Sequence, residues 1–288
     1  MKSVRETAYA KINLGLDILG KREDGYHEVS MIMQTLDLKD TITITEVNKP
    51  GIHIKTNIPG LSCGEDNLAY KAAKLLADYA QITPSISISL NKKIFMAAGL
   101  AGGSADAAAV LRGLNRLWNL GLNNQVLEKM SARLGSDIPF CIEGGTMWAQ
   151  GRGEVLTKLS DVPEQLVVLA KPKGLEVSTA WVYKNYNRGR VIQVPNIVQL
   201  KQNLANGMHA CTPYMSNVLE TVTIPSHPVI AQIKATMLSA GAFFALMSGS
   251  GPTVFAFCDN LETAENIITA LKDFEVETAI VRTVGRKK

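Results

Sequence analysis

The segment Gly99-Leu100-Ala101-Gly102-Gly103-Ser104-Ala105-Asp106 stands where a loop runs into an Ala- and Leu-rich helix, predicted from about 104 to 118. Glycine adopts positive φ and lets backbone N–H groups come close to a ligand. The first turn of the helix adds unpaired N–H groups and the positive end of its dipole, which suit a phosphate. The spacing matches neither a Walker A loop nor the dinucleotide fingerprint. Anion binding and a plain tight turn capped by Ser104 therefore remain equal alternatives here.

The chain on both sides of this segment mixes predicted strands and helices. Alternating apolar and polar residues predict strands over 41–46, 52–57 and 85–90, and a helical pattern with Asp66 as its cap covers 66–80. Further helices are predicted near 124–134, 178–186, 196–206, 228–239 and 260–272, and further strands over 165–170, 243–247, 253–257 and 275–281. This mixture is typical of an α+β or α/β protein. The glycines around residue 152 mark the best boundary, which predicts two domains, 1–152 and 153–288.

Composition narrows the classes of function. The 288 residues carry a formal net charge of +4, and aromatic residues make up 6%. A nucleic-acid binder would need a basic stripe interleaved with aromatics, which the sequence lacks, so we expect no nucleic-acid partner. The four cysteines form no CxxC pair and the histidines are scattered, so no zinc spacing appears. No signal-peptide core or membrane-length apolar run is found, so we expect a cytoplasmic protein that does not enter a membrane.

A second glycine turn, Ser248-Gly249-Ser250-Gly251-Pro252, lies between two predicted apolar strands. A hairpin turn would account for it, although the segment is longer than a minimal hairpin needs. Its N–H groups would also form a compact nest for an anion. Two such loops in one chain suggest a polyphosphate ligand.

Asp137 is a carboxylate between apolar segments, in Gly135-Ser136-Asp137-Ile138-Pro139. It either caps a short turn before Pro139 or acts as a base or metal ligand, and the second role needs a cationic partner. Lys11, within an apolar strand-like stretch, is the best candidate for that partner, although an edge lysine that faces water is the alternative. Period-2 alternation puts Asn13 on the same strand face, so Lys11 and Asn13 are predicted to form a polar pair.

A predicted turn, Asp24-Gly25-Tyr26-His27-Glu28, follows this stretch. It is either a hairpin tip with a surface histidine or part of a binding site. In a binding site, Tyr26 would stack on a flat ring and His27 would form a hydrogen bond with the edge of that ring.

Three segments together resemble the three motifs of the GHMP small-molecule kinases: Ala10-Lys11-Ile12-Asn13-Leu14, the 99–106 segment and the 248–252 turn. The resemblance runs from about residue 5 to about 280. It implies an α+β fold of two domains, with a ribosomal S5 domain 2-like N-terminal domain that binds ATP and a ferredoxin-like C-terminal substrate domain. The segments Arg22–His27 and Leu134–Phe140 are similar to the branch of the family that phosphorylates a cytidine-diphosphate-linked polyol in isoprenoid biosynthesis.

The resemblance also implies roles for individual residues. Lys11 and Asp137 would be the catalytic pair, in which Asp137 accepts the proton of a substrate 2-hydroxyl and Lys11 keeps Asp137 ionised. Asn67 would lie near the adenine of ATP. The residues implied around the ATP phosphates are Phe95, Met96, Ala97, Ala98, Gly99, Leu100, Ala101, Gly102, Gly103, Ser104 and Ala105. The residues implied at the substrate are Asn13, Tyr26, His27, Tyr183, Ser250 and Gly251. ATP and Mg²⁺ are expected as co-substrate and cofactor, with the Mg²⁺ ligands unassigned, in a monomer or a homodimer.

Two points depart from the family pattern or stay open. Phe95 stands where the family usually carries proline, which predicts a changed entrance to the loop without lost activity. Trp181 is a rival to Tyr183 for stacking on the cytosine. The alternative functions are another GHMP kinase, such as a homoserine or mevalonate kinase, a regulatory protein that has lost catalysis, and a nucleic-acid binder.

Overall fold

The computed structural model describes residues 1–286. Its strands are β1 (Ser3–Lys21), β2 (His27–Glu46), β3 (Gly51–Thr56), β4 (Ser85–Asn91), β5 (Thr146–Gln150), β6 (Val155–Lys158), β7 (Leu166–Pro172), β8 (Phe244–Met247), β9 (Val254–Cys258) and β10 (Val276–Arg282). Its α-helices are α1 (Leu68–Ala80), α2 (Gly102–Leu117), α3 (Asn124–Ser131), α4 (Ile138–Glu143), α5 (Thr179–Lys184), α6 (Ile197–Asn203), α7 (Met208–Cys211), α8 (Glu220–Ser226), α9 (Val229–Ser239) and α10 (Leu261–Ala270). Three short 3₁₀ segments are η1 (Arg188–Arg190), η2 (Leu204–Asn206) and η3 (Thr212–Tyr214). The α+β prediction is confirmed.

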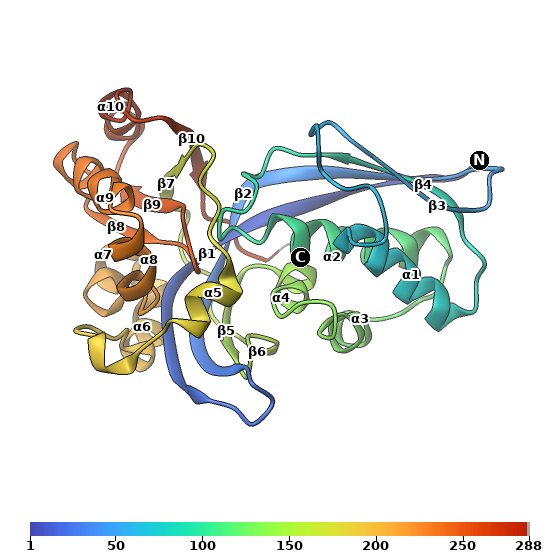
Figure 1. Cartoon of the computed structure of the whole chain (residues 1–288), viewed down its shortest axis with the longest axis horizontal. Helices are drawn as coiled ribbons and strands as arrows, with labels where there is room; N and C mark the ends of the chain where they lie inside the picture. The colour runs from blue at the N-terminus through green and yellow to red at the C-terminus, as the bar shows by residue number, and fades with distance from the viewer. Residues whose placement is uncertain (287–288) are drawn as a thin grey trace. The chain divides into compact units, whose positions relative to one another are not determined.

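The chain forms two compact units, and neither is one continuous stretch of sequence (Figure 1). The first unit contains residues 1–10, 38–94 and 101–144, and the second contains 11–37, 95–100 and 145–288. The long strands β1 and β2 contribute residues to both units, and so does the glycine-rich segment. The division into domains 1–152 and 153–288 stays a prediction.

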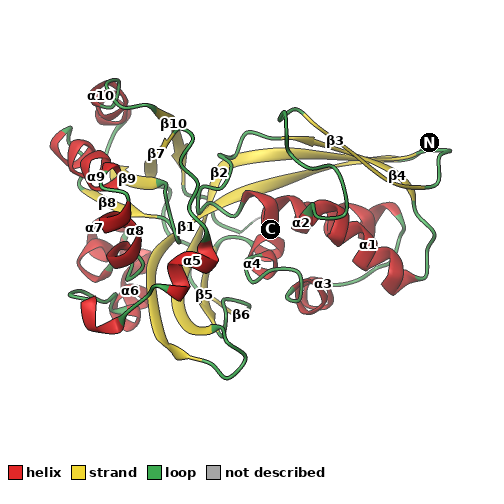
Figure 2. Ribbon diagram, viewed as in Figure 1, coloured by secondary structure: helices red, strands yellow, loops and turns green. Residues whose placement is uncertain are grey.

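In the first unit, strand alternation builds one apolar face that helices cover. Ile42 and Ile44 of β2, with Ile86, Ile88 and Leu90 of β4, are all buried, as period-2 alternation requires. The end of β2 pairs antiparallel with β4, and β4 pairs parallel with β3. Helix α1 packs on α2, which packs on α4, and α3 packs on α4 (Figure 2). The predicted cap of the first helix was wrong by one residue: Asn67, not Asp66, accepts a hydrogen bond from the Ala69 N–H.

The second unit contains a four-stranded antiparallel sheet with the order β10-β7-β9-β8. Helices lie between β7 and β8, and α10 lies between β9 and β10, so the chain follows a β-α-β-β-α-β order. Every residue of β7 and β9 is buried, and α9 and α10 pack on the sheet. This order and these pairings confirm the ferredoxin-like expectation for the C-terminal part of the chain. Residues Met31–Gln34 of β2 pair with β5, which pairs with β6.

The structure also bears on two expectations from the composition, those for the cysteines and for membrane-spanning segments. Cys211 and Cys258 are buried thiols, and burial raises the pKa of each to about 11, as expected of inert core cysteines, whereas Cys63 is exposed. Within residues 1–286, no helix has both the length and the apolar character needed to cross a membrane.

Candidate active site

The start of α2 provides an open helix N-terminus in the first unit. Its N-cap residue, Ala101, is left-handed with φ of 59° and makes no side-chain capping bond. The prediction that Ser104 could be the plain cap is therefore wrong, because Ser104 lies inside the first turn. The first N–H groups of a helix have no intrahelical partner, and an anion can satisfy them where no side chain does. This geometry favours the phosphate-binding alternative for residues 101–105.

A buried lysine cluster, made of Asp40, Lys92 and Asp106, lies beneath this turn in the first unit. Lys92 Nζ donates to Asp40 Oδ2 and to Asp106 Oδ2, each at 2.5 Å. Asp40 Oδ1 accepts from the backbone N–H groups of Lys93 and Ile94 at 2.5 and 2.8 Å. The cluster therefore joins the segment that enters the glycine-rich loop to the helix that leaves it.

The charges of this cluster are unbalanced, because two carboxylates share one ammonium. Burial and the charge of Asp40 raise the pKa of Asp106 to about 7, even though Lys92 opposes the shift. Asp106 Oδ1 is buried without a hydrogen-bond partner among the described residues. Burial alone would lower the pKa of Lys92, but Asp106 and Asp40 outweigh it and raise that pKa.

Asn67 and Asp137, two further predicted site residues, also belong to the first unit. Asn67 uses both side-chain polar atoms on the backbone, since Nδ2 donates to Ser62 O at 2.6 Å and Oδ1 accepts from Ala69. A Cβ on Gly103 would lie 3.5 Å from Leu68, so the N-termini of α1 and α2 are neighbours. Asp137 is half-buried at the N-cap position of α4 but makes no capping bond there. Its pairing with Lys11 stays a prediction, as does the adenine role of Asn67.

Lys11 and Asn13 form the predicted polar pair on β1 in the second unit. Lys11 Nζ donates to Asn13 Oδ1 at 2.7 Å, and both side chains are buried. The Lys11 N–H donates to the Leu100 carbonyl at 3.1 Å, which ties this strand to the glycine-rich loop. The expectation from strand alternation is confirmed, and the alternative of a solvent-facing edge lysine is wrong.

The two glycine segments meet in the second unit. Ser248 Oγ donates to the Gly99 carbonyl at 3.0 Å, and Gly99 has φ of 73°. A Cβ on Gly99 would stand well inside 3.0 Å of the Ser248 carbonyl oxygen, so only glycine fits. Ala97 is also left-handed, with φ of 47°. Non-glycine residues in this conformation are strained, and such strain clusters at ligand-binding loops.

The turn 248–252 lies next to the Lys11–Asn13 pair. A Cβ on Gly249 would lie 3.4 Å from both Lys11 Nζ and Asn13 Oδ1. The Ser250 hydroxyl is hydrogen-bonded to the Thr179 hydroxyl at 2.9 Å, and the Gly251 N–H donates to Ser248 O at 2.9 Å. Residues from β1, from loop 95–100 and from this turn are therefore brought together in the second unit.

His27 lies among aromatic rings at the start of β2. Its ring centroid is 5.4 Å from that of Tyr183 and 6.4 Å from that of Tyr186. Burial, followed by the positive charge of Lys21, lowers the pKa of His27, so the ring is neutral at neutral pH. Tyr26 is exposed, and the Arg152 guanidinium lies 4.7 Å from its ring centroid. The structure thus brings His27 and Tyr183 together.

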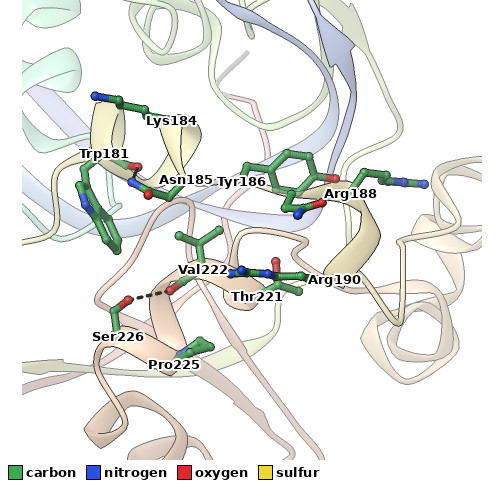
Figure 3. Close-up of a pocket in the computed structure, with 11 residues that line it drawn as sticks. Trp181, Lys184, Asn185, Tyr186, Arg188, Arg190, Thr221, Val222, Pro225 and Ser226 are labelled. Carbon is green, nitrogen blue, oxygen red and sulfur yellow. Dashed lines mark hydrogen bonds between the residues drawn. The ribbon is translucent and has the colours of Figure 1, made fainter.

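Trp181, the rival of Tyr183, lines a separate cavity of about 570 Å³ in the second unit (Figure 3). None of the predicted substrate residues lines this cavity. Its walls come from α5, η1 and α8 and carry three cationic residues. One of them, Arg188, is paired with Asp17 at 2.5 Å. The placement of Trp181 favours Tyr183 as the ring that accompanies His27.

Two groups of site residues were missed from the sequence. The first is the pair Asp40 and Lys92, which strand alternation places on buried faces. Lys92 continues the buried face of Ile86, Ile88 and Leu90, and Asp40 continues that of Ile42 and Ile44. The second is Asn217, Glu220 and Thr223, spaced three residues apart. All three contact residues 247–250 through hydrogen bonds.

Among the residues that the structure describes, no group of three or more His, Cys, Asp or Glu side chains is placed to hold a metal ion. Mg²⁺ in phosphoryl transfer takes most of its ligands from phosphates and water, so it needs few protein ligands.

Known protein families and curated proteins match this chain over most of its length. The family model "GHMP kinases N terminal domain" matches residues 67–145, and "GHMP kinases C terminal" matches 196–276, together more than half of the chain. A relative from Bacillus cytotoxicus, named 4-diphosphocytidyl-2-C-methyl-D-erythritol kinase, is 46% identical over 98% of this chain and 97% of its own. A protein of the same name from Alkaliphilus metalliredigens is 43% identical over 100% of this chain and 99% of its own.

Solved structures give the same result. A crystal structure of 4-(cytidine 5'-diphospho)-2C-methyl-D-erythritol kinase matches with a TM-score of 0.83 and 31% identity, over 98% of this chain and 100% of that one. Homoserine kinase from Cytophaga hutchinsonii matches with a TM-score of 0.78 at 20% identity, over 100% of this chain and 96% of that one, which shows a shared fold. The chain belongs to the GHMP kinase family and is a small-molecule kinase that uses ATP as co-substrate.

Proposed function

We propose that this kinase transfers the γ-phosphate of ATP to the 2-hydroxyl of 4-diphosphocytidyl-2-C-methyl-D-erythritol, a step of the non-mevalonate isoprenoid pathway. The observation that supports this most strongly is the meeting of the Lys11–Asn13 pair, loop 95–100 and the turn 248–252 in the second unit. The relatives at 43–46% identity carry the name of this activity. The ring pair of His27 and Tyr183 gives the site a place for a flat base.

ATP binds, in this proposal, through backbone N–H groups around residues 95–105. The uncapped first turn of α2 faces the phosphates, and the Ser104 hydroxyl in that turn supplies an oxygen ligand. The donor set fits Mg²⁺, because hydroxyl and phosphate oxygens are the ligands that this ion prefers. When bound, Mg²⁺ neutralises charge on the phosphates.

Asp137 accepts the proton of the 2-hydroxyl while that oxygen forms a bond to the γ-phosphorus and the bond to ADP breaks. Lys11 carries the opposite charge and is oriented by Asn13 at 2.7 Å, so it stabilises the charge that develops on the transferred group. Tyr183 and Tyr26 stack on the cytosine, and neutral His27 forms a hydrogen bond with its edge. Asn13, Ser250 and Gly251 complete the substrate wall.

The test is ADP release from purified protein with ATP, Mg²⁺ and one of three acceptors: the cytidylylated methylerythritol, mevalonate or homoserine. We expect turnover with the first acceptor alone. Asp137→Asn should lower kcat by about 10²–10⁴-fold with a smaller effect on KM. Asp78→Asn, which changes an exposed carboxylate on α1, is the matched control and should retain wild-type kcat.

Two other outcomes would each point to one of the alternative functions. Turnover with mevalonate or homoserine would keep the kinase and reject the cytidine-reading site. A protein that binds ATP but phosphorylates none of the three would instead be the regulatory alternative. The expectations of a cytoplasmic monomer or homodimer without nucleic-acid or membrane partners stay predictions.

A further inference from the structure

Three polar side chains of the segment 217–223 hold the turn 248–252 and Met247, the last residue of β8 before it. Asn217 Nδ2 donates to Met247 O at 2.8 Å and to Gly249 O at 2.7 Å. Thr223 Oγ1 donates to Ser250 O at 3.1 Å. Glu220 Oε1 accepts from the Met247 N–H at 2.9 Å, and the same carboxylate is paired with Lys234. Together the three side chains contact Met247, at the end of β8, and Gly249 and Ser250 of the turn.

Asn217 is itself fixed in place. Its Oδ1 accepts from the Leu219 N–H at 3.0 Å, so all the polar atoms of its amide are used. The backbone on either side pairs with β1, since Leu16 N donates to Ser216 O at 2.9 Å and Val218 N donates to Leu16 O at 3.1 Å. The side chain is buried, with 3% of its surface exposed. The amide can therefore point its two N–H groups only at the carbonyls of Met247, the last residue of β8, and of Gly249 in the turn.

The held residue, Gly249, is the one nearest the reaction chemistry. A Cβ there would lie 3.4 Å from Lys11 Nζ and 3.4 Å from Asn13 Oδ1. Displacement of Gly249 by a fraction of an ångström would therefore change the space around the Lys11 ammonium. Small displacements of this kind can cost orders of magnitude in rate.

We infer that Asn217 is a positioning residue: by holding the Gly249 carbonyl, it sets where the turn 248–252 meets Lys11 and Asn13. This inference deepens the proposed function and rests on it for its kinetic consequences. Asn217 does not touch the reacting atoms, so it acts on kcat through the turn.

The variant that tests this is Asn217→Asp, which keeps the shape of the side chain and exchanges two N–H donors for an oxygen. At pH 8.5 an ionised carboxylate would face two buried carbonyl oxygens. We expect kcat to fall by about tenfold or more there, with both KM values within about threefold of wild type. The matched control is Asn115→Asp, since Asn115 donates to Leu122 O at 2.8 Å and accepts from its N–H at 3.0 Å in another turn. This control should keep a near-wild-type kcat.

A pH profile separates lost positioning from general damage. Once protonated, the carboxyl group that Asn217→Asp introduces regains one donor. Burial, the two carbonyls and the charge of Glu220 favour that neutral acid, whereas Lys11 and Lys234, the partner of Glu220, oppose it. The kcat of Asn217→Asp relative to wild type should therefore rise at least about threefold between pH 8.5 and pH 6. A ratio that does not change with pH, or a loss no larger than that of Asn115→Asp, would overturn the inference.

Hydrogen exchange provides a readout that does not depend on turnover. At pH 8.5, where the introduced carboxylate is ionised, peptides that cover 244–258 should exchange faster in Asn217→Asp than in wild type, whereas peptides that cover 85–91 should not. Unchanged exchange over 244–258 contradicts the inference. If wild-type protein phosphorylates none of the acceptors, the proposed function fails, and the exchange result still decides whether Asn217 holds the turn.

A second variant covers the case in which Asn217→Asp does not fold. Thr223→Val removes only the donor to the Ser250 carbonyl, and we expect kcat to fall by about threefold with unchanged KM values. A wild-type kcat and wild-type exchange of 244–258 in this variant would contradict the role assigned to the segment 217–223.

Discussion

Gly99 and Gly103 belong to the same glycine-rich segment, but replacement by alanine should affect them in opposite ways. At Gly99 the new Cβ would overlap the Ser248 carbonyl oxygen, and φ is 73°. The left-handed conformation costs alanine roughly 1–2 kcal/mol, and a backbone shift to relieve the overlap costs roughly 1–3 kcal/mol. Gly99→Ala should therefore lower the free energy of unfolding by about 2–5 kcal/mol.

At Gly103 the new Cβ would meet only the flexible end of Leu68, at 3.5 Å, within a helix. Alanine is a better helix former than glycine by up to about 1 kcal/mol, so Gly103→Ala should leave the free energy of unfolding unchanged or slightly higher. If phosphates approach this turn, the added methyl group should still raise the KM for ATP.

Urea denaturation followed by tryptophan fluorescence, together with the KM for ATP, measures both effects. The expected pattern is a stability loss for Gly99→Ala and an affinity loss without a stability loss for Gly103→Ala. A Gly99→Ala protein within about 0.5 kcal/mol of wild type would refute the steric argument. An unchanged KM for ATP in Gly103→Ala would refute the placement of the phosphates at α2.

Three further predictions follow from the geometry. Because the raised pKa of Asp106, about 7, means that the folded protein binds a proton that the unfolded chain releases near pH 4, stability should fall as pH rises between these values. The difference in unfolding free energy between Asp106→Asn and wild type should therefore become more favourable to the variant from pH 4.5 to pH 7, and urea midpoints that move in parallel would contradict this. Lys92→Met leaves two buried carboxylates without their cation and should cost about 3–5 kcal/mol, partly restored by a second change, Asp40→Asn; a Lys92→Met protein as stable as wild type would contradict this expectation. Tyr183→Ala should raise the KM for the cytidylylated substrate by about tenfold and Trp181→Ala by less than twofold, and the reverse order would make Trp181 the stacking ring.

The sequence pattern predicted those parts of the site and fold whose placement depends on a single strand. The placement of Lys11 and Asn13 on one face and the strands of the first unit follow from period-2 alternation. The two strands on either side of 248–252 were instead predicted as apolar runs, and both are observed. The ferredoxin-like order came from the family resemblance, because strand order depends on pairings that local patterns do not encode.

Residues whose role depends on distant partners could not be predicted in this way. Lys92 reaches Asp40 and Asp106 across 52 and 14 residues of sequence, and Asn217 reaches Gly249 across 32. A charged residue on the buried face of a strand is a local sign that a partner exists, but the sequence does not say which residue it is. Asp66 and Asn67 are adjacent and both are good caps, so the local pattern does not decide which of them caps α1.

Transfer of labelled phosphate to competing acceptors is a direct test of which substrate this kinase phosphorylates. Wild-type protein would be supplied with ATP labelled at the γ-phosphate and with equal concentrations of 4-diphosphocytidyl-2-C-methyl-D-erythritol, mevalonate and homoserine. Phosphorus NMR and mass spectrometry would then locate the label. We expect the label on the 2-hydroxyl of the cytidylylated substrate, and at least about a hundredfold less of it after Asp137→Asn over the same period. Label on mevalonate or homoserine, or on another hydroxyl, would contradict it.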